Sequence, residues 1–149
     1  MNNLIRLTIK EVKPYNFKFL LSYVLIRYKV FIKEFKRKAF EEFSTIDITA
    51  NHYVFLKGKK AIGIARVIRK GNCVEFGRIA VIKEYRNQGN GKKFIEIMIS
   101  NIKNENKAKL ISLFVADISL INFYSQHGFL ENGETYFDMI PYVNMIKYL

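Results

Sequence analysis

At 149 residues the chain has the length of one domain with a single hydrophobic core, residues 1–149, and is too short for two domains of ordinary size. Half of the residues are hydrophobic and 15% are aromatic, a composition that excludes a disordered protein. The chain has 25 lysines and arginines and 13 aspartates and glutamates, so its formal charge is +12. This excess reflects either compositional bias or an anionic ligand, which could be nucleic acid or a phosphorylated small molecule.

The first third of the chain predicts a strand, a long helix and a charged connection. Apolar and polar residues alternate over Ile5–Val12, a pattern typical of a strand that ends at the Pro14 turn. Helical spacing follows over Phe17–Phe35. The residues expected on the buried face of this helix are Leu20, Leu21, Val24, Tyr28, Phe31 and Ile32. The mixed segment Lys36–Asn51 is expected to form a short helix and a loop.

The remaining chain predicts three antiparallel strands and then alternating helices and strands. Turn signals at Lys57–Lys60 and Gly71-Asn72 divide His52–Ile82 into a meander. The later elements are a helix beginning near Gly89, a buried strand at Leu110–Val115, a short helix at Ile118–His127, and strands at Glu134–Met139 and Tyr142–Tyr148. The predicted fold is therefore an α/β sheet of six or seven strands with flanking helices.

The cysteine and hydropathy patterns predict the setting of the protein. Cys73 is the only cysteine, which excludes an internal disulfide and a cysteine-based zinc site, so we predict no metal and a reducing, cytoplasmic environment. Met1–Pro14 lacks the apolar segment of a signal peptide. No run approaches the ~18 apolar residues of a membrane span, so we expect no membrane partner.

The most informative segment joins the third strand of the meander to the next helix. A strand that enters a glycine-rich turn and then a helix presents unpaired N–H groups, and the helix dipole adds a partial positive charge. Gly89 and Gly91 allow a pyrophosphate to approach the backbone, and Arg86 and Lys92 can add charged contacts. The segment matches neither a Walker loop nor a dinucleotide fingerprint, because it lacks their required Gly and Ser/Thr positions.

The stretch Arg78–Gly91 resembles motif A of the GNAT superfamily of N-acetyltransferases, in which Arg/Gln-x-x-Gly-x-Gly/Ala follows a Val-rich strand. Downstream, Asn122–Phe129 resembles motif B, which usually ends in Tyr-x-x-x-Gly-Phe. Arg27–Phe31, Glu42–His52 and the tail from Gly133 are similar to the ElaA-like branch of the superfamily, so the resemblance covers most of the chain.

This resemblance implies the GNAT fold, a mixed and mostly antiparallel sheet with splayed central strands, and acetyl-CoA as the cofactor. A bulge near Ile79-Ala80 is implied to separate neighbouring strands, so that the pantetheine amides pair with the exposed strand. The residues implied to bind the cofactor are Ile79, Ala80, Val81, Arg86, Asn87, Gln88, Gly89, Asn90, Gly91, Lys92, Asn122 and Tyr124.

Acetyl transfer needs a polarised thioester carbonyl, a neutral amine and a proton for the departing thiolate. The Val81 N–H is the expected donor to the developing oxyanion. The resemblance places Tyr124 where many relatives protonate the sulfur; the alternative is an aromatic side chain that only packs on the sheet. Glu75 is the candidate base, as in the histone-acetylating branch, with a solvated strand carboxylate or deprotonation through water as alternatives.

Three residues are candidates for binding the acceptor. Arg78 either holds an anionic group or pairs with Glu75. His52 can titrate near neutral pH, and the alternative is a structural histidine. Tyr142 stands after Pro141, where the ElaA-like branch commonly has His, so an imidazole has no role at that position.

We therefore predict an N-acetyltransferase that moves the acetyl group of acetyl-CoA to a small primary amine, by direct attack in a ternary complex. The +12 charge favours a phosphorylated amine such as an amino-sugar phosphate. The alternatives are acetylation of a protein or peptide at lysine or the N-terminus, and a non-catalytic basic module that binds nucleic acid. Scattered lysines without a stripe of stacking aromatics count against nucleic acid. The apolar tail Tyr142–Leu149 would permit a homodimer.

Overall fold

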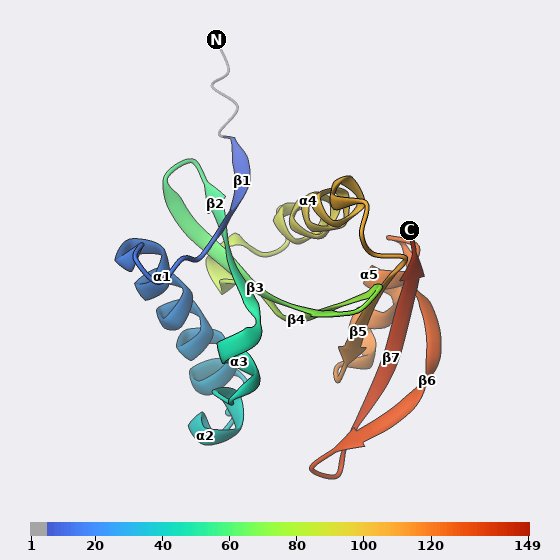
Figure 1. The fold of residues 1–149 in the computed structure, drawn as a ribbon. Helices are drawn as coiled ribbons and strands as arrows, with labels where there is room; N and C mark the ends of the chain where they lie inside the picture. The colour runs from blue at the N-terminus through green and yellow to red at the C-terminus, as the bar shows by residue number, and fades with distance from the viewer. Residues whose placement is uncertain (1–5) are drawn as a thin grey trace.

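The computed structural model describes residues 6–149, which form one mixed seven-stranded sheet with helices on both faces (Figure 1). The strands are β1 (Leu7–Glu11), β2 (Asn51–Lys57), β3 (Lys60–Lys70), β4 (Cys73–Val81), β5 (Leu110–Val115), β6 (Leu130–Phe137) and β7 (Ile140–Tyr148). Their order in the sheet is β1-β2-β3-β4-β5-β7-β6, and only β4 and β5 are parallel. The predicted α/β fold with a mostly antiparallel sheet is confirmed.

The helices are α1 (Phe17–Arg27), the π-helix η1 (Tyr28–Glu34), α2 (Ala39–Glu42), α3 (Ile46–Thr49), the 3₁₀ turn η2 (Lys83–Tyr85), α4 (Asn90–Glu105), the 3₁₀ turn η3 (Ile118–Leu120) and α5 (Ile121–Ser125). In Figure 1, α1 and α4 lie on opposite faces of the first four strands. The rings of Phe55 in β2 and Phe94 in α4 stack with centroids 4.4 Å apart, which fixes α4 against the sheet. Among the described residues, no helix is both long and apolar enough to cross a bilayer.

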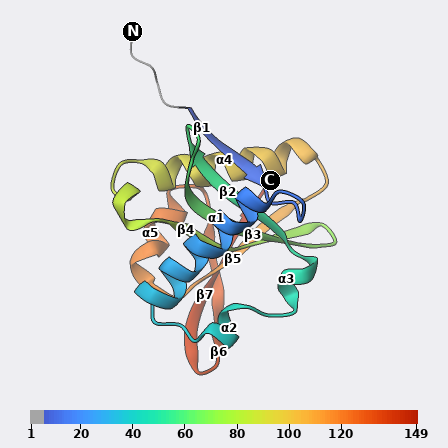
Figure 2. The ribbon, with the colours of Figure 1, turned by 90° about the vertical axis from the view of Figure 1, so that its left-hand side faces the viewer.

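The predicted helix over Phe17–Phe35 is confirmed in extent, as α1 followed directly by η1, but its predicted buried face is wrong. Leu20, Leu21, Val24 and Tyr28 are exposed, although Phe31 is buried as expected. The side chains that face the sheet are Tyr23, Ile26, Arg27, Val30 and Phe31. Because this helix carries apolar residues all round, spacing alone cannot select a face. Figure 2, which looks onto α1, shows the face that points away from the sheet.

A bulge and a parted strand pair lie in the middle of the sheet. Ile64 pairs with Ala80 and Arg66 pairs with Gly77, so Arg78 and Ile79 on β4 oppose one residue of β3. Arg78 itself has φ +50°. The bulge thus begins one residue before the predicted Ile79-Ala80.

The parallel pairing of β4 with β5 runs only from Cys73–Leu110 to Phe76–Leu113, and beyond Phe76 the two strands separate. Gly63 is required beside this region, because a Cβ there would lie 2.6 Å from the backbone oxygen of Ala80. The predicted splay of the central strands is therefore confirmed.

The two strands predicted at the end of the chain are present, and they form a hairpin in which β7 lies between β5 and β6. Both edges of the tail Tyr142–Tyr148 are consequently paired within the chain, and β6 forms the edge of the sheet. Pairing of two chains through the edge of this tail would need β6 to be displaced. A homodimer stays a prediction.

Candidate active site

The loop before α4 presents free backbone N–H groups to solvent. Asn87 and Gly89 have positive φ angles of +58° and +75°, and Gly89 caps α4 without a side-chain hydrogen bond. The buried side chain of Asn90 donates instead to the Tyr85 carbonyl at 2.8 Å, which fixes the turn from below. The first N–H groups of α4 are not satisfied by the helix itself, and together with the helix dipole they can hold an anion.

The Arg86 side chain is already engaged by the protein. Its Nε donates to the Val81 carbonyl at 2.7 Å, and its two terminal nitrogens pair with the Glu34 carboxylate at the end of η1. Lys29 and Glu84 form a second ion pair between the same helix and the loop, with Nζ and Oε1 2.5 Å apart. The guanidinium of Arg86 therefore braces the loop in this structure, whereas the Lys92 side chain is exposed and free to reach a phosphate.

The gap between β4 and β5 contains a polar group of the backbone. The Ile82 N–H donates to the Ile62 carbonyl at 2.9 Å. Because hydrogen-bonded and non-hydrogen-bonded pairs alternate along antiparallel strands, the preceding residue, Val81, turns its N–H and C=O away from β3. Its C=O accepts from Arg86, and its N–H points into the gap.

The two sequence motifs meet at this gap. A Cβ at Gly91, at the start of α4, would lie 4.0 Å from the ring of Phe123 in α5. Asn122 is exposed at the start of α5, whereas the side chain of Tyr124 is only 8% exposed. The structure thus brings the loop of motif A beside the helix of motif B.

Tyr124 is held by aromatic packing. Its ring makes edge contacts with Phe123 and Phe129, with centroid distances of 5.1 and 5.9 Å. Burial raises the pKa of Tyr124 to about 12, because the phenolate would lose its hydration. The side chain is consequently a neutral hydrogen-bond donor at physiological pH.

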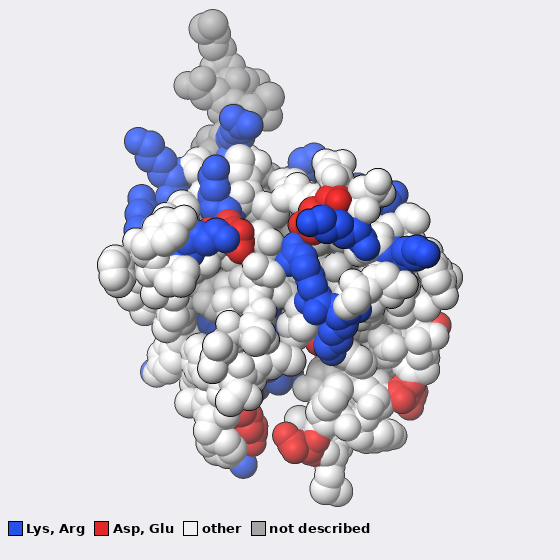
Figure 3. Space-filling model, in the orientation of Figure 1, with Lys and Arg blue, Asp and Glu red and all other residues white. Residues whose placement is uncertain are grey.

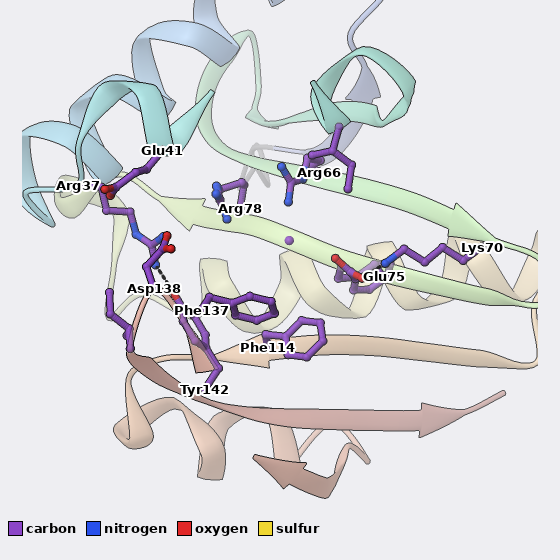
Figure 4. Close-up of a pocket in the computed structure, with 14 residues that line it drawn as sticks. Arg37, Glu41, Arg66, Lys70, Glu75, Arg78, Phe114, Phe137, Asp138 and Tyr142 are labelled. Carbon is purple, nitrogen blue, oxygen red and sulfur yellow. Dashed lines mark hydrogen bonds and ion pairs between the residues drawn. The ribbon is translucent and has the colours of Figure 1, made fainter. Parts of the chain in front are cut away.

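A cavity of about 450 Å³ lies where β4 and β5 part, between the segment after η1 and the β6–β7 hairpin (Figure 4). The space-filling view shows a hollow between the segment after η1 and the β6–β7 hairpin (Figure 3). Of the predicted residues, Glu75, Arg78 and Tyr142 line it together. The other charged and aromatic residues around it are Arg37, Glu41, Arg66, Lys70, Phe76, Phe114, Phe137 and Asp138. The cavity therefore combines arginine side chains with an aromatic wall.

An ion-pair network lies beside this cavity. Arg78 Nε donates to Glu42 Oε1 at 2.6 Å, and Arg27 Nε donates to the same oxygen at 2.8 Å. Asp47 accepts from Arg27 at 3.1 Å and from Arg66 at 3.0 Å. The network carries three positive and two negative charges, so it leaves one uncompensated positive charge next to the cavity.

The predicted alternative of an Arg78–Glu75 ion pair is wrong. Glu75 pairs with Lys70, with Nζ and Oε2 2.6 Å apart, whereas Arg78 turns to Glu42. Arg37 donates to the Tyr142 hydroxyl at 2.9 Å. Sequence reasoning placed neither Arg37 nor Arg66 in the site. The one available signal was Arg27, a charged residue within the apolar run Tyr23–Tyr28, which indicates a buried acidic partner.

His52 does not line the cavity. Its Nε2 lies 2.8 Å from the Asp47 carbonyl oxygen, and its ring contacts the ring of Tyr23 with centroids 4.7 Å apart. This position supports the turn that carries Asp47. The described residues contain no group of three side chains that could hold a metal ion.

Asp47→Asn should lower the free energy of unfolding at neutral pH by about 2 kcal/mol or more. Burial alone would raise the pKa of Asp47, but hydrogen bonds from Arg27, the Ser44 N–H and Arg66 outweigh it and lower the pKa to about 2. The ionised group therefore stabilises the fold above the ordinary pKa of 3.8, and this contribution is lost as the pH falls towards 2. Urea unfolding at pH 7, 4 and 2.5 measures both effects. A variant whose stability falls with acid as steeply as that of wild type would contradict this assignment.

A splayed sheet with a helix start that can hold an anion at one side of the gap and a polar cavity at the other suits an enzyme that transfers a group between two substrates. The family model described as "Acetyltransferase (GNAT) domain" matches residues 11–149, and the chain belongs to this family. It is an acetyl-CoA-dependent N-acetyltransferase.

The chain is also similar to a curated relative in sequence and to solved structures in fold. The uncharacterized N-acetyltransferase YjcF of Bacillus subtilis is 27% identical over 124 residues, which cover 82% of this chain and 87% of YjcF. The crystal structure of Escherichia coli ElaA matches with a TM-score of 0.79 at 19% identity, covering 95% of this chain and 99% of ElaA. A GNAT acetyltransferase from Elizabethkingia anophelis with acetyl-CoA bound matches with a TM-score of 0.66 at 15% identity, covering 96% and 98% of the two chains. The predicted likeness to the ElaA fold is confirmed.

Proposed function

We propose that the protein transfers the acetyl group of acetyl-CoA to a small primary amine that carries an anionic group, with a phosphorylated amine such as an amino-sugar phosphate as the preferred class. The observation that carries this proposal is the cavity beside the splay, which has Arg37, Arg66 and Arg78 on its walls. Arginine forks suit phosphate and carboxylate groups. Glu75, one of the three carboxylates that line the cavity, pairs with Lys70 and not with any of these arginines.

The proposed cofactor site lies on the other side of the gap. The diphosphate would bind the N–H groups of the loop Asn87–Lys92, and the pantetheine arm would run along Ile79–Val81. The free N–H of Val81 and the exposed position of Asn122 support this path. Because Arg86 pairs with the Glu34 carboxylate, its side chain holds the loop in place. The phosphates would therefore bind mainly to backbone N–H groups and Lys92.

The chemistry then follows from the residues on both sides of the gap. The Val81 N–H would stabilise the oxyanion that develops when the amine nitrogen attacks the thioester carbon. As the carbon–sulfur bond breaks, the Tyr124 hydroxyl would supply a proton to the thiolate. Glu75 shares the cavity with the proposed anion-binding arginines, and its carboxylate would take the proton that the amine loses, directly or through water.

A panel of matched amine pairs tests this function. Thiol release from acetyl-CoA would be followed with glucosamine and glucosamine 6-phosphate, with further neutral and phosphorylated or carboxylated pairs, and with lysine peptides. We expect kcat/KM to be about 10-fold or more higher for the anionic member of a pair, the size of one charge-assisted contact. Equal rates within every pair, or acetylation of peptides alone, would overturn the proposed acceptor class.

The nucleic-acid alternative has less support. Lysine and arginine side chains are spread over the upper region of the face in Figure 3 rather than gathered in one stripe. Arg27, Arg66 and Arg78 lie in the ion-pair network beside the cavity, with side chains at most 21% exposed, and so add little to the open surface.

A further inference from the structure

Arg78 occupies an unusual backbone position for a residue with a side chain. It lies in the β-bulge with φ +50°, a region that residues other than glycine rarely adopt and that persists only where neighbouring contacts enforce it. The residue lines the acceptor cavity, and its guanidinium lies 5.8 Å from the centre of the Phe31 ring. Burial lowers the pKa of Arg78, and the Glu42 carboxylate counters this effect.

Glu42 is itself fixed from behind. Its side chain is 0% exposed. Its Oε1 accepts from Arg78 Nε at 2.6 Å and from Arg27 Nε at 2.8 Å, while its backbone carbonyl accepts from a terminal nitrogen of Arg27. Glu42 and Arg27 therefore fix each other's side chains through two hydrogen bonds, and Arg78 bonds to the Glu42 of this pair.

The Glu42 carboxylate is only half used by the protein. Its Oε2 is buried without a hydrogen-bond partner among the described residues. An arrangement optimised for stability alone would satisfy both oxygens, since an unpaired buried acceptor is destabilising. Glu42 Oε1 holds the Nε of Arg78, and the terminal NH₂ groups of that side chain make no hydrogen bond to the described residues.

We propose that Glu42 is the positioning residue of the acceptor site: it orients Arg78 so that its terminal NH₂ groups bind the anionic group of the acceptor. In Figure 4 the guanidinium groups of Arg78 and Arg66 lie near each other at the edge of the cavity. This role rests on the proposed function, because it assumes an anionic acceptor. Glu42 acts through Arg78 and does not touch the reacting atoms.

The kinetic test is Glu42→Gln, which keeps the shape of the side chain and removes its charge. We expect KM for the phosphorylated amine to rise about 10-fold or more, with kcat and the Kd of acetyl-CoA within about 3-fold and KM for the matched neutral amine unchanged. The matched control is Glu105→Gln, which breaks a comparable Arg69–Glu105 pair (2.7 Å) away from the cavity and should change none of these values. Equal rises in KM for both amines would show a merely structural role and overturn the proposal.

A second measurement needs no substrate. In the wild-type protein, the ¹⁵N resonance of Arg78 Nε, assigned by its loss in Arg78→Lys, should show a slowly exchanging N–H. Free exchange of this proton with solvent would overturn the proposal, even if Glu42→Gln fails to fold. Arg78→Lys keeps the charge but loses the Nε contact, and should raise KM for the anionic amine as Glu42→Gln does. If wild type acetylates no anionic amine, the proposed function fails, whereas a protected Nε–H would still support the Glu42–Arg78 link.

Discussion

Tyr124→Phe is expected to lower kcat about 100-fold or more, within the range of 10²–10⁴ typical of a lost general acid, while the Kd of acetyl-CoA changes by less than about 2-fold. The substitution removes one hydroxyl and keeps the ring that packs against Phe123 and Phe129. A loss confined to kcat would therefore report the missing proton donor rather than a disturbed fold. Steady-state kinetics with saturating amine, together with calorimetric titration of acetyl-CoA, measure the two quantities.

The pH profile provides an independent check on the same residue. Burial raises the pKa of Tyr124 to about 12, so the phenol stays protonated throughout the working range. Ionisation of this group should therefore cause no decrease in the kcat of the wild type at any pH up to ~10. Tyr136→Phe, which removes an exposed hydroxyl on β6, is the matched control and should retain the wild-type rate. A Tyr124→Phe enzyme with unchanged kcat would show that water protonates the thiolate.

Gly91→Ala is expected to weaken acetyl-CoA binding about 30-fold, or about 2 kcal/mol, while the free energy of unfolding stays constant or rises by up to about 1 kcal/mol. In the free protein the added Cβ meets only the Phe123 ring at 4.0 Å, an ordinary contact, and alanine favours the helix more than glycine does. The same methyl group would occupy the approach of a diphosphate to the start of α4. Opposite effects on stability and affinity are thus the signature of a cofactor site.

Thermal unfolding with and without acetyl-CoA separates these two effects, because a bound ligand stabilises the folded protein by RT ln(1 + [L]/Kd). Ser100→Ala, on the exposed face of α4, is the control for a small substitution in the same helix. If Gly91→Ala bound acetyl-CoA as tightly as wild type, the diphosphate would have to lie elsewhere.

The cofactor side of the site could be predicted from sequence because its signals are local. The glycine-rich loop, the amphipathic pattern of α4 and the short spacing to Tyr124 all lie within residues 86–124, and each element follows its own periodicity. The succession of strands and helices along the chain followed from the same patterns, whereas the order of the strands in the sheet was not predicted. The bulge begins one residue before the predicted position, because the register of β3 against β4 is set by contacts between strands that local patterns do not contain.

The acceptor side was only partly predictable because its partners come together through the tertiary fold. Glu42 and Asp47 lie in a mixed charged segment that resembles a solvated loop, and their partners Arg66 and Arg78 lie on two different strands. The predicted buried face of α1 was wrong for a related reason. Apolar residues lie on every side of the helix, and the face that is buried carries Arg27, which pairs with Glu42. Charge pairing over long sequence separations carries no periodic signal.

A crystal structure of the protein with coenzyme A is the most direct test. We predict diphosphate oxygens within hydrogen-bond distance, about 2.7–3.2 Å, of backbone nitrogens between Asn87 and Lys92, with the pantetheine arm along Ile79–Val81 and the sulfur near the Tyr124 hydroxyl. Coenzyme A bound away from the parted strands, or a diphosphate contacted only by side chains, would contradict this account.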